Sequence, residues 1–134
     1  MTSKRDVLPM EVMGYDFGYI IYRTTFMRGK EMNFIGALHD YGLVIINNKT
    51  LQKVDNIVAI LSKPVRLDKV TLEKSNILDI FIENCGRVYA PSRLNDQRKG
   101  LRGRVLINNV QLIGYKIGNL NFNEVGFFCV VFII

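Results

Sequence analysis

Apolar and polar residues alternate with a period of two along several short segments of the chain, a pattern typical of β-strands with one buried face. Gly18–Phe26 is rich in aromatic and β-branched residues, which favour strands. Ile77–Asn84 places Leu78, Ile80 and Ile82 on one side, opposite a side that carries two acidic residues. Both segments are therefore predicted to be strands that turn an apolar face to a core.

Two pairs of adjacent asparagines mark predicted turns. Asn47 and Asn48 follow the apolar run Tyr41–Ile46, and strand-like sequence resumes in Thr50–Val54. The second pair lies within Arg104–Ile117, between the letters RVLI and VQLIGYKI. Asparagine tolerates the positive φ that tight hairpin turns require, so both segments are predicted to be β-hairpins.

The remaining pattern favours an all-β fold of the sandwich or jelly-roll type. A further apolar run, Asn56–Leu61, ends before Pro64 and is predicted to be another short strand. No stretch of ten or more residues keeps a convincing helical period, and turn signals recur at intervals of about 8–12 residues. The length of 134 residues, with 49% hydrophobic and 22% charged residues, fits one globular domain.

The last segment, Phe127–Ile134, consists of apolar residues alone. It is too short to span a membrane as a helix, which needs about 20 residues, so no membrane span is expected. We expect either a buried strand or an aggregation-prone segment, and its role stays open. The first residues of the chain carry charge and lack the apolar core of a signal peptide.

Basic residues are concentrated in the segment Glu83–Val105, in a chain of formal net charge +6. The basic residues of this run are Arg87, Arg93, Arg98, Lys99, Arg102 and Arg104. A nucleic-acid site would interleave such charges with stacking aromatic rings, and here Tyr89 is the only aromatic residue. We therefore expect a solvated loop with a glycine-bearing turn that leads into a strand, and nucleic-acid binding through residues 87–104 is the weaker alternative.

The residue types that carry catalysis or bind metals are sparse. A single histidine, His39, and two distant cysteines, Cys85 and Cys129, do not form a metal-ligand set. His39 and Asp40 are neighbours in the chain, and in a strand such neighbours point to opposite faces instead of forming a dyad. We predict no catalytic, metal-binding or cofactor-binding residues in this chain, and we expect both cysteines to be buried small apolar residues.

The triplet Asn48-Lys49-Thr50 matches the acceptor sequence for N-linked glycosylation. It lies in the first predicted hairpin turn, where an attached glycan would project into solvent. Asn48 is therefore a candidate glycosylation site, and the triplet favours the secretory pathway.

Three stretches of the chain, in order, resemble motifs of one known domain. Met10–Phe26 (MEVMGYDFGYIIYRTTF), Ala37–Asp55 (ALHDYGLVIINNKTLQKVD) and Leu78–Ile117, which contains ENCGRV and DQRKG, resemble the accessory β-domain of glycoside hydrolase family 35 β-galactosidases. The similarity is greatest to the animal β-galactosidase-like branch and extends over Leu8–Leu120. Residues 121–134 lie beyond it.

The resemblance implies a galactose-binding-like jelly roll and a non-catalytic role. In the family, a barrel that precedes this domain hydrolyses terminal β-galactosides through two carboxylates, and that barrel is absent from this chain. We therefore expect 1–134 to be a single domain that packs against and supports a catalytic barrel, without glycosidase activity of its own. Family members imply a lysosomal or secreted location.

A free-standing carbohydrate-binding module is the alternative function. Such a module would bind β-galactosides weakly, by stacking aromatic rings on the apolar face of the sugar. Because the chain has no tryptophan, the candidate rings are Tyr15, Tyr41 and Tyr89, and each is better suited to packing in the core or a turn.

Asp40 and Arg87 are predicted to form a structural ion pair. Both lie at predicted strand ends inside the family-like motifs HD and GRV, and a carboxylate can pair bidentately with a guanidinium. The family's next motif letters, V-N-[YF]-G, are replaced here by Val88-Tyr89-Ala90-Pro91, so the turn after Arg87 must differ.

Overall fold

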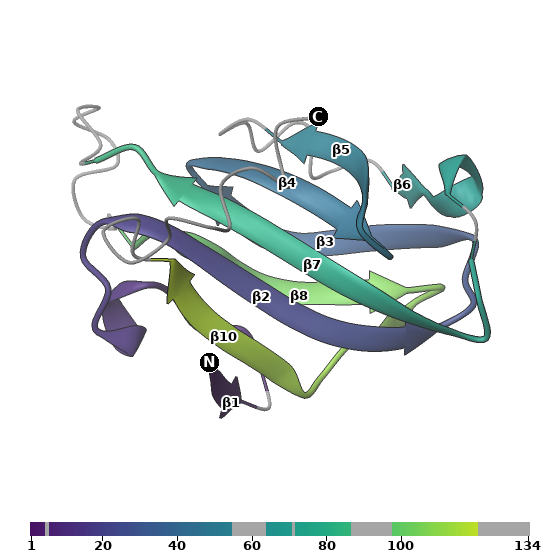
Figure 1. Ribbon diagram of the computed structural model, residues 1–134, viewed down its shortest axis with the longest axis horizontal. Coiled ribbons are helices and arrows are strands. Elements are labelled where there is room, and N and C mark those ends of the chain that lie inside the picture. Colours follow the sequence, from purple (N-terminus) through teal and green to yellow (C-terminus); the bar gives the residue numbers. More distant parts are fainter. Residues whose placement is uncertain (5, 55–63, 71, 87–97, 121–134) are drawn as a thin grey trace.

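The computed structural model describes residues 1–4, 6–54, 64–70, 72–86 and 98–120, which form a β-sandwich (Figure 1). Their strands are β1 (Thr2–Lys4), β2 (Gly18–Met27), β3 (Glu31–His39), β4 (Tyr41–Ile46), β5 (Lys49–Val54), β6 (Val65–Arg66), β7 (Ser75–Asn84), β8 (Gly100–Ile107), β9 (Val110–Gln111) and β10 (Tyr115–Leu120). Two single-turn 3₁₀ helices, η1 (Glu11–Met13) and η2 (Leu67–Lys69), complete the described elements.

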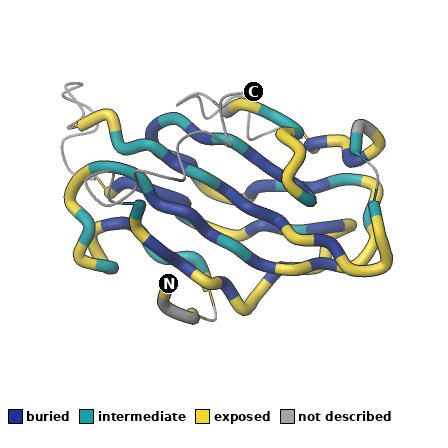
Figure 2. The backbone as a smooth tube through the Cα atoms, in the orientation of Figure 1, coloured by how far each residue is buried: buried dark blue, intermediate teal, exposed yellow. Residues whose placement is uncertain are grey.

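The described strands pair antiparallel in two sheets. The six-stranded sheet has the order β1-β10-β2-β7-β4-β5, and the four-stranded sheet has the order β6-β3-β8-β9. Buried apolar side chains from both sheets form one core between them. Figure 2 colours the buried residues of both sheets dark blue along the backbone. The predicted all-β sandwich is therefore confirmed, and its finer assignment to the jelly rolls stays a prediction.

The strands predicted from alternation are present with nearly the predicted bounds. In β2, Ile20 and Tyr22 are fully buried, and in β7 so are Leu78, Ile80 and Ile82. β4 begins and ends where the apolar run does. The predicted strand at residues 56–61 and the apolar segment at residues 127–134 lie outside the described residues.

Strand β3 was not predicted, although it is the centre of the four-stranded sheet. Its alternation of Met32, Phe34 and Leu38, all buried, is interrupted by Gly36. Gly36 lies opposite Gly103 of β8, with φ values of 123° and 118°, and a Cβ at Gly36 would overlap the backbone of β8. The close approach of two glycines thus breaks the pattern by which the strand could have been recognised.

The hairpin predicted over Arg104–Ile117 is only partly correct. β8 and β9 pair through two residue couples, Leu106 with Gln111 and Ile107 with Val110. The chain then turns at Gly114, where φ is 74°, and crosses to the other sheet. There Tyr115 to Leu120 pair as β10 with β1 and β2, because Tyr115 and Ile117 are buried in that half of the core.

The two asparagine pairs form the predicted turns. All four asparagines have positive φ, 49° and 63° in the first pair and 47° and 66° in the second, as type I′ turns require. In the first turn, Asn47 Oδ1 accepts from the Ile77 N–H at 2.9 Å, and Asn47 Nδ2 donates to Asn76 Oδ1 at 2.9 Å. Asn47 therefore ties the β4–β5 turn to β7, whereas Asn48 is exposed.

We expect Asn47→Ala to lower the free energy of unfolding by about 1–3 kcal/mol, because it removes the side-chain acceptor of the Ile77 amide and one of the hydrogen bonds of the fully buried Asn76. Asn48→Gly should change it by less than about 0.5 kcal/mol, since glycine accepts the same positive φ and the side chain is exposed. Urea denaturation of both variants checks this. Equal losses would contradict the inward role of Asn47.

Candidate functional site

A buried ion pair lies at the end of the sandwich where β3, β4, β7, β8 and η1 meet, at the left of Figure 1. Lys99 Nζ lies 2.6 Å from Asp40 Oδ2 and 2.7 Å from Asp40 Oδ1. Only 5% of the lysine side chain and 9% of the aspartate side chain are exposed. We call Asp40, Lys99 and the residues hydrogen-bonded to them the hub.

The chain topology brings Asp40 to the hub. Asp40 connects the end of β3 in one sheet to the start of β4 in the other. Its backbone N–H donates to the Glu83 carbonyl oxygen at 3.2 Å, and its Oδ2 also accepts from the Cys85 N–H at 2.9 Å. The carboxylate thus joins the turn between the sheets to the end of β7.

Lys99 is held from the opposite side by η1. Its backbone N–H donates to both carboxylate oxygens of Glu11, at 2.9 and 3.0 Å, and its carbonyl oxygen accepts from the Met10 N–H at 2.9 Å. The start of β8 is therefore fixed to the segment before β2, with the ammonium group pointing at Asp40.

We also count Gly100, the next residue after Lys99, and its neighbour Tyr22 as part of the hub. Tyr22 Oη donates to the Leu8 carbonyl oxygen at 2.6 Å and accepts from the Leu101 N–H at 3.1 Å. Gly100 has φ of 90°, and a Cβ there would overlap Tyr22 Oη, so only glycine fits. Burial raises the pKa of the Tyr22 hydroxyl above its ordinary value, so the group stays protonated further into the alkaline range than an exposed tyrosine does.

Two further acidic side chains lie on the outer face of the six-stranded sheet, and each has a partner. Asp79 pairs with Arg23 through contacts of 2.7 and 2.8 Å, and its residue is 3% exposed. Glu83 accepts from Tyr19 Oη at 2.8 Å, and the Tyr19 ring stacks on Phe81 with centroids 5.3 Å apart. Both carboxylates thus link β7 to its neighbour β2.

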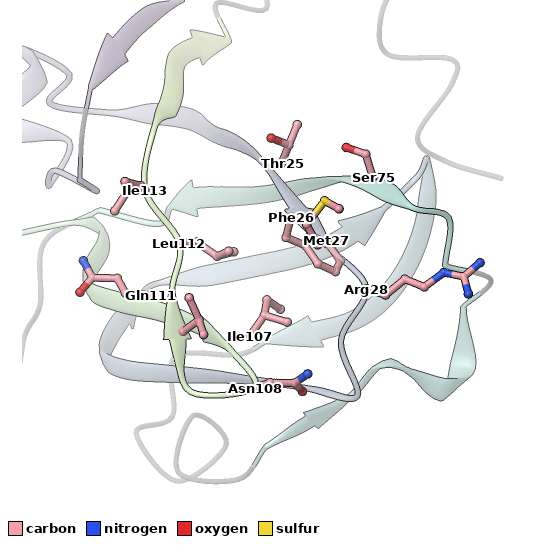
Figure 3. Close-up of a pocket in the computed structure, with 11 residues that line it drawn as sticks. Thr25, Phe26, Met27, Arg28, Ser75, Ile107, Asn108, Gln111, Leu112 and Ile113 are labelled. Carbon is pink, nitrogen blue, oxygen red and sulfur yellow. The ribbon is translucent and has the colours of Figure 1, made fainter.

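An open groove of about 410 Å³ lies at the opposite end of the sandwich (Figure 3). Apolar side chains of β2 and of the segment from β8 to β10 dominate its lining, among them Phe26, Met27, Leu112 and Ile113. The described lining residues include no Asp, Glu, His or Cys, so they offer no acid–base pair or metal ligand. In the described parts of the chain, no three such side chains gather where they could hold a metal ion.

The predicted site residues have different outcomes. Asp40 is buried in an ion pair, but the partner that the structure gives it is Lys99. Arg87 lies outside the described residues, so its pairing with Asp40 stays a prediction. Asn48 is exposed in the β4–β5 turn. Of the candidate rings, Tyr15 and Tyr41 are half-buried, and Tyr89 lies outside the described residues.

The expectation of a solvated basic loop is wrong for Lys99, which is 4% exposed. A lysine is seldom buried unless it has a charged partner, and nothing in the local sequence identifies one. Only the DQRKG motif of the resemblance marks this position as special. The expectation that both cysteines are buried is wrong for Cys85, which is exposed, and Cys129 lies outside the described residues. Sequence reasoning also passed over Phe17, an aromatic residue that is 82% exposed between η1 and β2.

The sandwich and its hub define an all-β domain whose distinctive polar residues serve packing. Residues 8–121 match the family described as the first all-beta domain of beta-galactosidase, and the chain belongs to this family. The match agrees with the range Leu8–Leu120 expected from the sequence.

Known relatives of the chain are much longer proteins. It is 32% identical over 114 residues to the beta-galactosidase of Xanthomonas manihotis, a match covering 81% of this chain and 18% of that protein. It is 30% identical over 111 residues to beta-galactosidase-1-like protein 2 of Homo sapiens, a match covering 83% of this chain and 16% of that protein. The chain thus corresponds to an accessory domain and spans under a fifth of these relatives. Its described part contains no helix long and apolar enough to cross a membrane.

Breaking the buried ion pair should be strongly destabilising. We expect Lys99→Met to lower the free energy of unfolding by about 3–5 kcal/mol, because the Asp40 carboxylate stays buried without its counter-charge. The double variant Asp40→Asn with Lys99→Met should recover part of this loss, since no charge is left buried and the amide oxygen can still accept from Cys85. Denaturant unfolding of the single and double variants measures the coupling, and strictly additive losses would contradict it.

Proposed function

We propose that this chain is a non-catalytic supporting domain that packs against the catalytic barrel of a β-galactosidase-like protein. The observation that carries the proposal is the hub. Asp40, Lys99 and Gly100, the most distinctive residues of the family-like motifs, are turned inward and hold the two sheets and η1 together. Because these motif residues hold the domain together, they favour a structural role for the domain in place of a catalytic one.

The carboxylates near the hub are poorly suited to glycoside hydrolysis. A retaining glycosidase needs two carboxyl groups about 5–5.5 Å apart on either side of a bound sugar. Here Asp40 is paired with Lys99, Glu11 accepts from a backbone amide, and Glu83 accepts from Tyr19. Each of the three is engaged in holding the chain together, which favours a catalytic centre located elsewhere in the protein.

We assign the barrel contact to the surface around η1. Val12 and Phe17 are 62% and 82% exposed there, and both follow the hub residues Met10 and Glu11 closely. A large exposed aromatic side chain is typical of the anchors that dominate protein interfaces. The matched relatives are several times longer than this chain, so they contain ample further sequence to cover this surface. The family also favours a lysosomal or secreted location.

A free-standing carbohydrate-binding module is the second candidate, and the exposed ring of Phe17 is the observation that favours it. A sugar could stack on this ring as readily as a protein surface could. Titration with galactose, with Phe17→Ala as the control, separates the two functions. The burial of Lys99 weakens the case for nucleic-acid binding, because this charge cannot reach a phosphate backbone. Salt-dependent retention of the chain on DNA would test this alternative.

The purified 134-residue chain should show no turnover of a chromogenic β-galactoside above buffer, because the proposal places the residues needed for retaining hydrolysis outside this domain. Glu83→Gln should leave that baseline unchanged. Turnover that Glu83→Gln abolishes would overturn the supporting role.

The barrel contact is tested in a chimera of the human relative in which the matched 111 residues are replaced by this chain. Phe17→Asp should lower the yield of folded, monodisperse chimera several-fold, because a carboxylate would replace the anchor at the interface. Val110→Asp is the matched control, since Val110 is 69% exposed at the opposite end of the sandwich. Equal yields for the two variants would reject the assigned surface.

A further inference from the structure

The acceptor triplet Asn48-Lys49-Thr50 occupies the tip of the β4–β5 hairpin, and all three residues are exposed. An Asn-x-Thr triplet on an exposed loop is the sequence on which N-linked glycans are placed in the secretory pathway. The turn is as short as a hairpin allows, because Ile46 pairs directly with Lys49. The backbone therefore presents Asn48 at the outermost point of the hairpin.

The two asparagines of this turn have different roles. Asn47 points inward and bonds to Asn76 and to the Ile77 amide. The turn is therefore held by Asn47, and a substituent on Asn48 breaks none of these bonds. In the second turn both Asn108 and Asn109 are exposed, and Asn108 Oδ1 accepts from the Lys30 N–H at 2.9 Å.

The position of the turn in the sandwich leaves room for a large hydrophilic group. β5 is the edge strand of the six-stranded sheet, and its turn with β4 lies next to the start of β7, at the end opposite the hub. A glycan there would lie far from Phe17 and from the surface assigned to the barrel. It would also cover one end of β5, which among the described strands has a neighbour on one side only.

We propose that Asn48 carries an N-linked oligosaccharide when the chain passes through a secretory compartment. The donor is an oligosaccharide linked to a lipid pyrophosphate. The bond between its anomeric carbon and the pyrophosphate oxygen breaks, a bond from that carbon to Asn48 Nδ2 forms, and the amide loses one proton as the lipid pyrophosphate leaves. The step involves no oxidation or reduction.

The test is to express the full chain behind a cleavable secretory leader in human cells. The secreted protein should migrate as a single larger species that shifts down after treatment with peptide-N-glycosidase. Mass spectrometry should then find Asp at position 48, the product of glycan removal. Because the leader supplies the compartment, this result is independent of the supporting function, which is read out by galactoside turnover and by the chimera.

Structure-guided variants make the test specific. Asn48→Gly removes the acceptor and keeps the positive φ of the turn, so the protein should be secreted without the shift. Thr50→Val should also abolish the shift, and Thr50→Ser should retain at least part of it. Gln111→Thr creates a new triplet at Asn109, the matching position of the second turn, and should add a second glycan.

If the secreted wild-type chain has the same gel mobility as the Asn48→Gly variant, Asn48 carries no glycan and the proposal is overturned. This holds whether or not the Gln111→Thr variant gains a glycan. A shift that persists in Asn48→Gly overturns it as well, because the modified residue would then lie elsewhere.

Discussion

Burial of Lys99 against Asp40 is the constraint on which the rest of the described structure depends. Taking an ammonium and a carboxylate out of water costs several kcal/mol per ion, and the cost is offset only by close pairing and further hydrogen bonds. Asp40 meets this demand with two contacts to Lys99 and one to the Cys85 amide. Because Asp40 connects the two sheets and Lys99 precedes β8, correct pairing fixes how the sheets face each other at this end.

The same constraint links widely separated segments of this chain. Asp40 and Lys99 are 59 positions apart, and Glu11 is 88 positions from Lys99, yet each contacts it directly. Gly100 is required next to Lys99 because Tyr22 Oη occupies the place of a Cβ. These motif residues are thus linked by direct contacts in the folded domain. A distinctive polar motif in an enzyme family can therefore mark a packing requirement in place of a catalytic one.

Local pattern was sufficient to predict β2, β4, β5 and β7 and both asparagine turns, because alternation and positive φ are properties of neighbouring residues. It failed where the determining contact is distant. Gly36 interrupts the apolar alternation that would have identified β3. The reason for this glycine, its close approach to Gly103, can be seen only in the paired strands. Gly114 sends the chain to the other sheet, where the burial of Tyr115 decides its partner. The burial of Lys99 depends on a carboxylate that no spacing rule would connect to it.

The two ends of the sandwich expose different groups. At the hub, the charges of the ion pair are directed inward, and Val12 and Phe17 are exposed. At the far end, the two asparagine turns lie beside the apolar groove, and Met27, Val110 and Ile113 are exposed there. Exposed apolar side chains thus occur at both ends, so exposure alone does not select a contact surface. What distinguishes the hub end is the large and highly exposed ring of Phe17.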